Sequence, residues 1–60
     1  MTIIDKSEER VKNGRTFVIE RYREKGFATP MWRYFEVENG VCYKIADMLF
    51  TKPNINRLKL

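Results

Sequence analysis

Few residues of this chain could do catalytic chemistry. The 60 residues include no histidine and a single cysteine, Cys42, so a Ser-His-Asp triad, a Cys-His pair and a zinc site all lack members. Glu36 and Glu38 stand two residues apart, which places two carboxylates on one face of a strand. We interpret them as solvated charges beside Tyr43 and a turn. The three glycines are isolated and form no phosphate-binding loop. We therefore expect a non-enzymatic protein with no cofactor, no metal site and no catalytic residue.

Basic and aromatic residues alternate in two places, Arg21-Tyr22-Arg23 and Trp32-Arg33-Tyr34. Arginine side chains contact phosphates and base edges, and aromatic rings stack on unpaired bases. The chain has 12 Lys and Arg against 8 Asp and Glu, a formal net charge of +4. A nucleic-acid-binding module is therefore one hypothesis, although no known binding signature is present. Its candidate contact residues are Arg15, Arg21, Arg23, Arg33, Lys52 and Arg57.

The sequence slightly favours a different hypothesis, a small binding protein that occupies the surface of a partner protein as an inhibitor, adaptor or small subunit. Interface cores are rich in aromatic residues, Met and Arg, and this chain has one Trp, three Tyr, four Phe and three Met. Its charge of +4 is spread over several segments, which makes a weak electrostatic footprint. The candidate contact residues are Trp32, Tyr34 and Tyr43, with Arg33 nearby.

The size of the chain bears on its partners and location. A chain of this length buries only about 60% of the surface that its unfolded form exposes, so a homodimer stays open. The lone Cys42 fits a reducing compartment and is expected to be a small buried hydrophobe. No apolar run approaches the roughly 20 residues of a membrane-spanning helix. We expect a cytoplasmic protein that does not bind membranes.

Asn39-Gly40 predicts the element that positions most of these side chains. An Asn-Gly pair between alternating residues is typical of a type I′ hairpin turn, whose two central residues need φ > 0. Residues 31–38 and 41–46 then form a hairpin in which opposite residues share a face. We favour as the core side the face with Met31, Arg33, Phe35, Val37, Cys42, Lys44 and Ala46. The reverse assignment stays open, because the other face is also bulky, with Trp32, Tyr34, Glu36, Glu38, Val41, Tyr43 and Ile45.

The N-terminal segment has two interpretations. As a helix, it would begin at Asp5 with Glu8 at the capping-box spacing. As a strand, residues 8–12 would pair with a strand over residues 15–23 through a second Asn-Gly turn, Asn13-Gly14. This pairing sets Lys12 opposite Arg15, which is mildly unfavourable. We favour the hairpin, because the helix would have almost no apolar stripe.

The remaining segments complete a single small domain over residues 1–60. Residues 24–30 are predicted to be a loop, because Gly26 and Pro30 interrupt the pattern. Ile45, Met48 and Leu49 have helical spacing, so residues 45–51 form either one or two helical turns or a continuing strand. Residues 54–60 are either an edge strand or an arm packed on the sheet. The fold class is mostly β, with a single twisted antiparallel sheet of three or four strands; a short C-terminal helix stays open.

Overall fold

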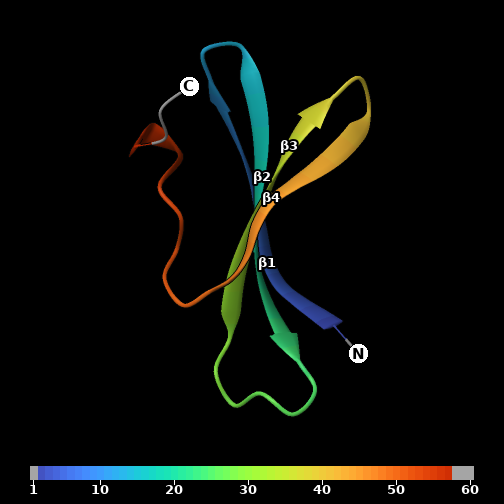
Figure 1. Cartoon of the computed structure of the whole chain (residues 1–60), viewed down its shortest axis with the longest axis vertical. Coiled ribbons are helices and arrows are strands. Elements are labelled where there is room, and N and C mark those ends of the chain that lie inside the picture. Colours follow the sequence, from blue (N-terminus) through green and yellow to red (C-terminus); the bar gives the residue numbers. More distant parts are fainter. Residues whose placement is uncertain (1, 58–60) are drawn as a thin grey trace.

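The computed structural model describes residues 2–57 and shows one open antiparallel sheet of four strands (Figure 1). The strands are β1 (Thr2–Lys12), β2 (Arg15–Glu24), β3 (Met31–Glu38) and β4 (Val41–Leu49). They lie in the order β1-β2-β3-β4, so each strand pairs with the one that precedes it. The predicted mostly β fold is confirmed, with four strands in the sheet.

Two Asn-Gly turns fix the register of the outer hairpins. Asn13 and Gly14 have φ of 52° and 73°, and Asn39 and Gly40 have φ of 51° and 77°. These positive values are those of type I′ turns. The N-terminal segment is therefore a strand, as the favoured interpretation predicted, and the helix alternative is wrong. Lys12 lies opposite Arg15 as expected.

One face of the sheet carries the main core, and we call it the covered face. Phe17 and Ile19 of β2 pack there with Tyr34 of β3, and Ile55 from the C-terminal segment completes the cluster. Phe17 is fully buried and Tyr34 is 8% exposed. The partly buried side chains packed against this cluster are Trp32, Ala46 and Leu49.

The favoured core side was wrong for the half of the sheet near the Asn-Gly turns, although Met31 of that side is buried at the other end, where it lies opposite the buried Tyr22. We expected Phe35, Val37 and Cys42 to point into the core, but they lie on the opposite face, which we call the open face. Cys42 is exposed rather than buried. The deciding factor is Ile55, because the C-terminal segment delivers this side chain to the face that also carries Phe17. The rows of the open face nearest the Asn-Gly turns consist of Val11, Thr16, Val37 and Cys42, and of Glu9, Val18, Phe35 and Lys44.

β4 is irregular and continues as a strand to Leu49. Its register against β3 shifts twice, so that Tyr34 faces Ala46 and Trp32 faces Leu49. Met48 has a φ of 55°, and its backbone N–H donates a hydrogen bond of 3.0 Å to the hydroxyl of Tyr22. Helical turns over residues 45–51 are therefore wrong, and the only helical element of residues 2–57 is a 3-10 turn, η1 (Ile55–Arg57). No helix in this described part is long and apolar enough to cross a membrane.

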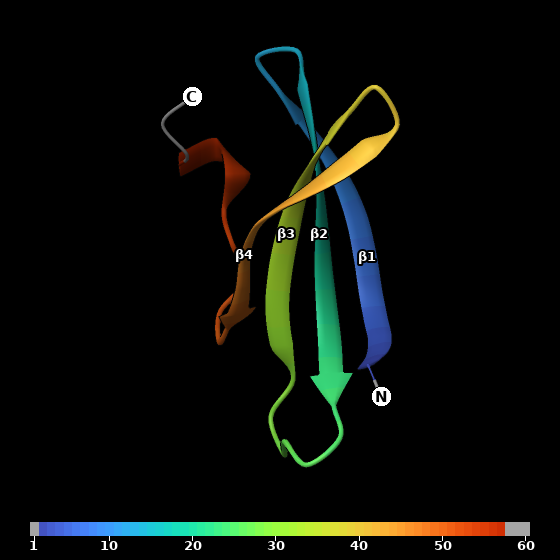
Figure 2. The ribbon, with the colours of Figure 1, turned by 45° about the vertical axis from the view of Figure 1, so that its right-hand side comes forward.

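The C-terminal segment turns back from the end of β4 (Figure 2), and its last described turn, η1, contacts β1. Lys12 Nζ donates hydrogen bonds to the carbonyl oxygens of Ile55, at 3.3 Å, and Asn56, at 2.9 Å. Lys52 forms an ion pair with Glu8 of β1 at 2.5 Å. Of the two alternatives for residues 54–60, the packed arm holds through residue 57, and residues 58–60 lie outside the described part of the chain.

Candidate nucleic-acid interface

The strand register sorts the charged side chains by face. Within residues 2–57, the open face has two basic side chains, Arg33 and Lys44, among the acids Glu9, Glu20 and Glu24, and Lys44 also pairs with Asp47 at 2.9 Å. On the covered face, basic side chains outnumber the acids Asp5, Glu8, Glu36 and Glu38. These basic side chains are Lys6, Arg10, Lys12, Arg15, Arg21, Arg23 and Lys52.

The basic side chains of the covered face gather on β1 and β2. Lys12 lies directly opposite Arg15, and Lys6 lies directly opposite Arg21. Like charges that face each other across a strand pair destabilise a sheet. Between these two pairs, β1 places Glu8 and Arg10 on the covered face. From Lys6 to Lys12, β1 therefore contributes only charged side chains to this face. We call this group of basic side chains beside the core the basic strip; it consists of Lys6, Arg10, Lys12, Arg15, Arg21, Arg23 and Lys52.

Trp32 borders the basic strip on β3. The Arg21 guanidinium and the Lys52 ammonium each lie 5.9 Å from the centre of its ring. Arg21 also lies 3.5 Å from Asp5, which holds Arg23 at 2.9 Å. Cations at this distance are attracted by the face of an indole ring. The arrangement places an aromatic ring next to two positive charges, which is the combination that binds a base next to its phosphate.

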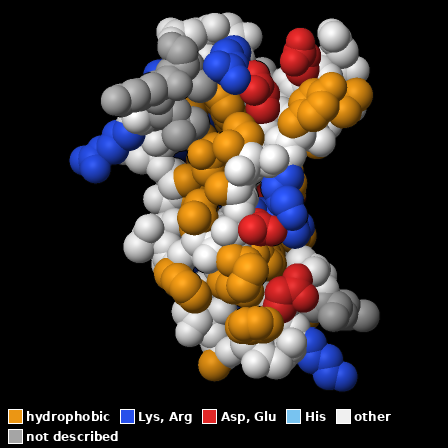
Figure 3. Space-filling model, in the orientation of Figure 1, with side chains coloured by type: hydrophobic (Ala, Val, Ile, Leu, Met, Phe, Trp, Pro, Cys, Tyr) orange, Lys and Arg blue, Asp and Glu red, His pale blue; other side chains and the backbone are white. Residues whose placement is uncertain are grey.

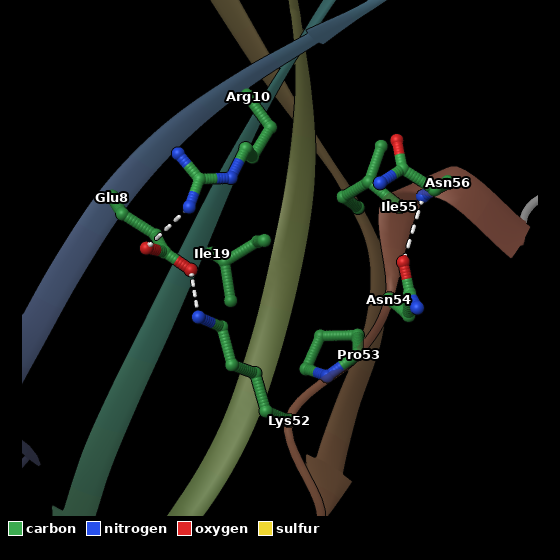
Figure 4. A pocket seen from close by; sticks show the side chains of 8 residues that line it. All are labelled: Glu8, Arg10, Ile19, Lys52, Pro53, Asn54, Ile55 and Asn56. Atoms are coloured by element: carbon green, nitrogen blue, oxygen red, sulfur yellow. Dashed lines mark hydrogen bonds and ion pairs between the residues drawn. The ribbon is translucent and has the colours of Figure 1, made fainter.

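A cleft of about 360 Å³ separates the basic strip from the C-terminal segment (Figure 4). Glu8 lies on one side of this cleft and pairs with both Arg10, at 3.2 Å, and Lys52, at 2.5 Å. The hydrogen bond from Lys52, with the added charge of Arg10, lowers the pKa of Glu8 from its ordinary 4.5. Asn54 and Asn56 line the opposite side. The cleft therefore offers both charged and amide groups to a polar ligand.

Arg15 forms a second charged cluster at the Asn-Gly end of the sheet. Its guanidinium holds Glu36 by two hydrogen bonds of 2.7 and 2.6 Å and lies 5.6 Å from the centre of the Phe17 ring. The hydrogen bond from Arg15 lowers the pKa of Glu36, and the same contact raises the pKa of Arg15. Two parallel hydrogen bonds of this kind also suit a phosphate group.

The structure brings together only part of each predicted contact set. For nucleic acid, Arg15, Arg21, Arg23 and Lys52 share the covered face. Arg33 does not belong with them, since it lies on the open face, where it pairs with Glu20 at 2.8 Å and stacks on Tyr22. Arg57 is exposed on η1.

For a protein partner, the predicted aromatic surface is not assembled. Tyr34 is buried and Trp32 is partly buried in the core, whereas Tyr43 is 54% exposed. Arg33 lies on the other face from all three. The tyrosine and tryptophan side chains are therefore used mainly to build the core of this small sheet.

Sequence reasoning missed three basic residues of the strip, Lys6, Arg10 and Lys12. Their signal is their spacing, because with Glu8 they occupy every second position of β1. That alternation places them on one face if the segment is a strand, which is the interpretation that the sequence favoured, so this spacing could have identified them.

Apolar side chains remain exposed at both ends of the molecule, as orange patches over the β3–β4 hairpin and near the β2–β3 loop show (Figure 3). Near the hairpin, Val41 and Tyr43 are 49% and 54% exposed. At the other end, Phe27 of the loop and Phe50 after β4 are 55% and 72% exposed. These side chains are separate from the basic strip.

Comparison with known proteins gives no match: no protein-family model fits the chain, and no curated protein or solved structure is similar to it at a significant level. The geometry of the sheet is therefore the basis for any functional assignment.

Proposed function

We propose that this chain is a non-enzymatic binding protein whose covered face contacts the phosphate backbone of nucleic acid. The observation that carries the proposal is the gathering of basic side chains from β1, β2 and the C-terminal segment on one face. Neutralising phosphates with Lys and Arg supplies most of the affinity of sequence-independent nucleic-acid binding. We therefore place nucleic-acid binding ahead of protein binding, which the sequence had slightly favoured. The basic residues are spread over several segments of the sequence, but the fold brings them to one face.

The like-charge pairs support the same function. The pairs Lys12–Arg15 and Lys6–Arg21 oppose folding, and the protein offsets them with neighbouring acceptors such as Glu36 and Asp5. Phosphate groups would take over these acceptor roles, since a phosphate binds Arg in the same two-point geometry as a carboxylate. Trp32, between Arg21 and Lys52, would then stack against an adjacent base.

The test is a titration of the protein with labelled single-stranded and duplex oligonucleotides at low and near-physiological salt. Anisotropy of the label reports binding, and Trp32 is the only tryptophan, so its fluorescence reports contact at the basic strip. We expect binding that weakens as salt rises and that quenches Trp32 with the single strand. Absence of binding to either oligonucleotide at low salt would overturn the proposal.

A matched pair of variants assigns the face. Lys6 and Lys44 are both exposed strand lysines, but Lys6 lies on the covered face and Lys44 on the open face. Lys6→Gln should lower the affinity and reduce the slope of log K against log salt by about one contact. Lys44→Gln should leave this slope unchanged. Equal losses of affinity in the two variants would show that binding depends on the net charge of the protein and not on the position of the basic strip.

A protein partner is the second candidate function. It is favoured by the exposed apolar side chains of the β3–β4 hairpin, Val41 and Tyr43, which are 49% and 54% exposed, because uncovered apolar surface often marks an interaction site. Of the predicted hot spots, only Tyr43 is freely available. Tyr43→Ala should weaken binding of a protein partner and leave nucleic-acid binding intact, whereas Lys6→Gln should do the reverse.

A further inference from the structure

The charged side chains of the open face are arranged so that one side of the face complements the other. Across the four strands, one row reads Glu9, Val18, Phe35 and Lys44, with an acid at the β1 edge and a base at the β4 edge. The preceding row on the same face has Glu20 on β2 and Arg33 on β3. In both rows the negative charge lies toward β1 and the positive charge toward β4.

We propose that two copies of this chain pack open face to open face, related by a two-fold axis parallel to the strands. This rotation sets β1 of one copy over β4 of the other and β2 over β3. Glu9 then faces Lys44 of the second copy, and Glu20 faces Arg33 of the second copy. Each contact occurs twice, and both rows extend ion pairs that exist within one chain, Glu20 with Arg33 at 2.8 Å and Lys44 with Asp47 at 2.9 Å. Glu9, which has no ion-pair partner within residues 2–57, gains one in the dimer.

The apolar row of the open face is compatible with the same axis. It reads Val11, Thr16, Val37 and Cys42, so Val11 meets Cys42 of the second copy and Thr16 meets Val37. Val11 is 65% exposed and Cys42 is also exposed. Packing the two faces removes these side chains from water, with the sheets about 10 Å apart and their strands roughly aligned.

Charge selects this axis over the other face-to-face arrangement. A two-fold axis perpendicular to the strands would set β1 over β1 and β4 over β4, so that an axis through the row of Glu9 and Lys44 makes Glu9 face Glu9 and Lys44 face Lys44. Like charges juxtaposed across an interface oppose association. The parallel axis is therefore the self-complementary solution.

The area required also points to a face of the sheet. A standard interface buries about 800 Å² of each partner, and the chain measures 37 × 24 × 15 Å. Only a face, and not an edge, can supply such an area. The covered face already holds the C-terminal segment, which leaves the open face. On this face Tyr22 and Met31 are buried near the β2–β3 loop, so the contact area lies in the rows toward the Asn-Gly turns.

Crosslinking tests the axis. Within one chain, Val11 and Cys42 are three strand spacings apart, about 14 Å, and a bismaleimide shorter than this cannot join them. In the dimer, a cysteine at position 11 faces Cys42 of the second copy across the sheet-to-sheet gap. The Val11→Cys variant should therefore give a crosslinked species of twice the monomer mass. The wild-type protein should not, because its two Cys42 thiols lie about 14 Å apart across the strands.

Arg10→Cys is the matched control for that experiment. Position 10 is adjacent to position 11 but points to the covered face, so its thiol should not be crosslinked to a second copy. Equal crosslinking of the two variants, or crosslinking of the wild-type protein through Cys42 alone, would overturn the proposed axis.

Charge reversal provides a second, independent test by sedimentation equilibrium. Glu9→Lys and Lys44→Glu should each weaken the dimer at least about tenfold, because each sets like charges against one another twice. Combining them should return the dissociation constant to within about threefold of the wild-type value. Since the two positions are far apart within one chain, this recovery can arise only between copies. A wild-type protein that stays monomeric up to millimolar concentration, or a double variant that does not recover, would overturn the proposal.

The dimer and the nucleic-acid interface are tested separately. The dimer uses the open face and the basic strip lies on the covered face, so neither Lys6→Gln nor Arg10→Cys should change the monomer–dimer equilibrium. Loss of nucleic-acid binding with an intact dimer would contradict only the proposed function, and a monomer that binds oligonucleotides would contradict only the dimer.

Discussion

Glu8 and Glu9 are neighbours in the sequence with opposite roles in the structure. Glu8 points to the covered face, where it holds Arg10 and Lys52. Glu9 points to the open face and has no ion-pair partner among residues 2–57. On a strand, the parity of a position determines which surface a charge belongs to, and a change at one of two adjacent residues leaves the other surface almost untouched.

This parity gives a direct prediction about nucleic-acid binding. Glu8→Gln and Glu9→Gln add the same net charge, but only the first releases Arg10 and Lys52 from a carboxylate. We expect Glu8→Gln to tighten binding roughly threefold more than Glu9→Gln, since breaking a solvent-exposed ion pair frees its cations at small cost. Oligonucleotide anisotropy at fixed salt measures the difference. Equal effects would mean that the cleft at Glu8 does not contact the ligand.

The Arg15–Glu36 pair gives a prediction about acid stability. Arg15 holds the pKa of Glu36 below its ordinary 4.5, so the carboxylate favours the folded state at pH values above about 4.5 and this contribution is lost as pH falls through the lowered pKa. Glu36→Gln should therefore lower the thermal midpoint at pH 7 but flatten its fall as the pH drops below about 4.5. Glu38→Gln, on the same face without an ion pair in the described part, should keep the wild-type fall.

At the scale of elements, the two Asn-Gly turns were predictable and the β4 irregularities were not. The conformation of each turn, Asn13-Gly14 and Asn39-Gly40, is determined by its two residues alone, because an Asn followed by Gly accommodates two positive φ values. The register shifts around Ile45 and Met48 have no such signal. Met48 is not a residue type that favours positive φ, and its conformation depends on a contact with Tyr22, 26 residues away along the chain.

That contact can be tested with two tyrosines. Tyr22 is 3% exposed and its hydroxyl accepts the hydrogen bond from Met48 N, so Tyr22→Phe leaves this N–H without its partner. We expect a loss of about 1 kcal/mol in the free energy of unfolding. Tyr43→Phe removes an exposed hydroxyl and should change it by less than about 0.5 kcal/mol. Urea denaturation compares the two, and equal losses would contradict a role for Tyr22 in fixing the end of β4.

At the scale of the molecule, the choice of core face was beyond the reach of the sequence. Phe35 and Val37 on one side and Trp32 and Tyr34 on the other are equally apolar, and alternation cannot rank two bulky faces. A side chain beyond the sheet, Ile55, decides the matter by packing on Tyr34. The same ambiguity explains why two of the residues predicted to form an aromatic contact surface, Trp32 and Tyr34, pack in the core instead. The paired strands and the absence of a helix at residues 5–12 were predictable, because they depend on the local sequence pattern.

Ile55 should therefore control the stability of the whole protein. It is 4% exposed, and truncation of a buried Ile to Ala costs about 2–5 kcal/mol, a large share of the stability of so small a domain. Ile55→Ala should lower the thermal midpoint strongly and expose Phe17 and Ile19 to a hydrophobic dye. Arg57→Ala, which changes an exposed residue of the same turn, should do neither. Similar melting of both variants would contradict the role of the C-terminal segment in the core.

β1 contributes eleven residues to the sheet, and not one of them is buried. An edge strand with so little apolar contact opens locally at low free-energy cost, whereas β2 and β3, which hold most of the buried side chains, open only when the molecule unfolds. Amide hydrogen exchange should therefore be fast along β1 and slow in β2 and β3. Because β1 carries Lys6, Arg10 and Lys12, a bound oligonucleotide should slow its exchange more than that of any other strand. The ligand would then hold in place a strand that the core of the protein does not.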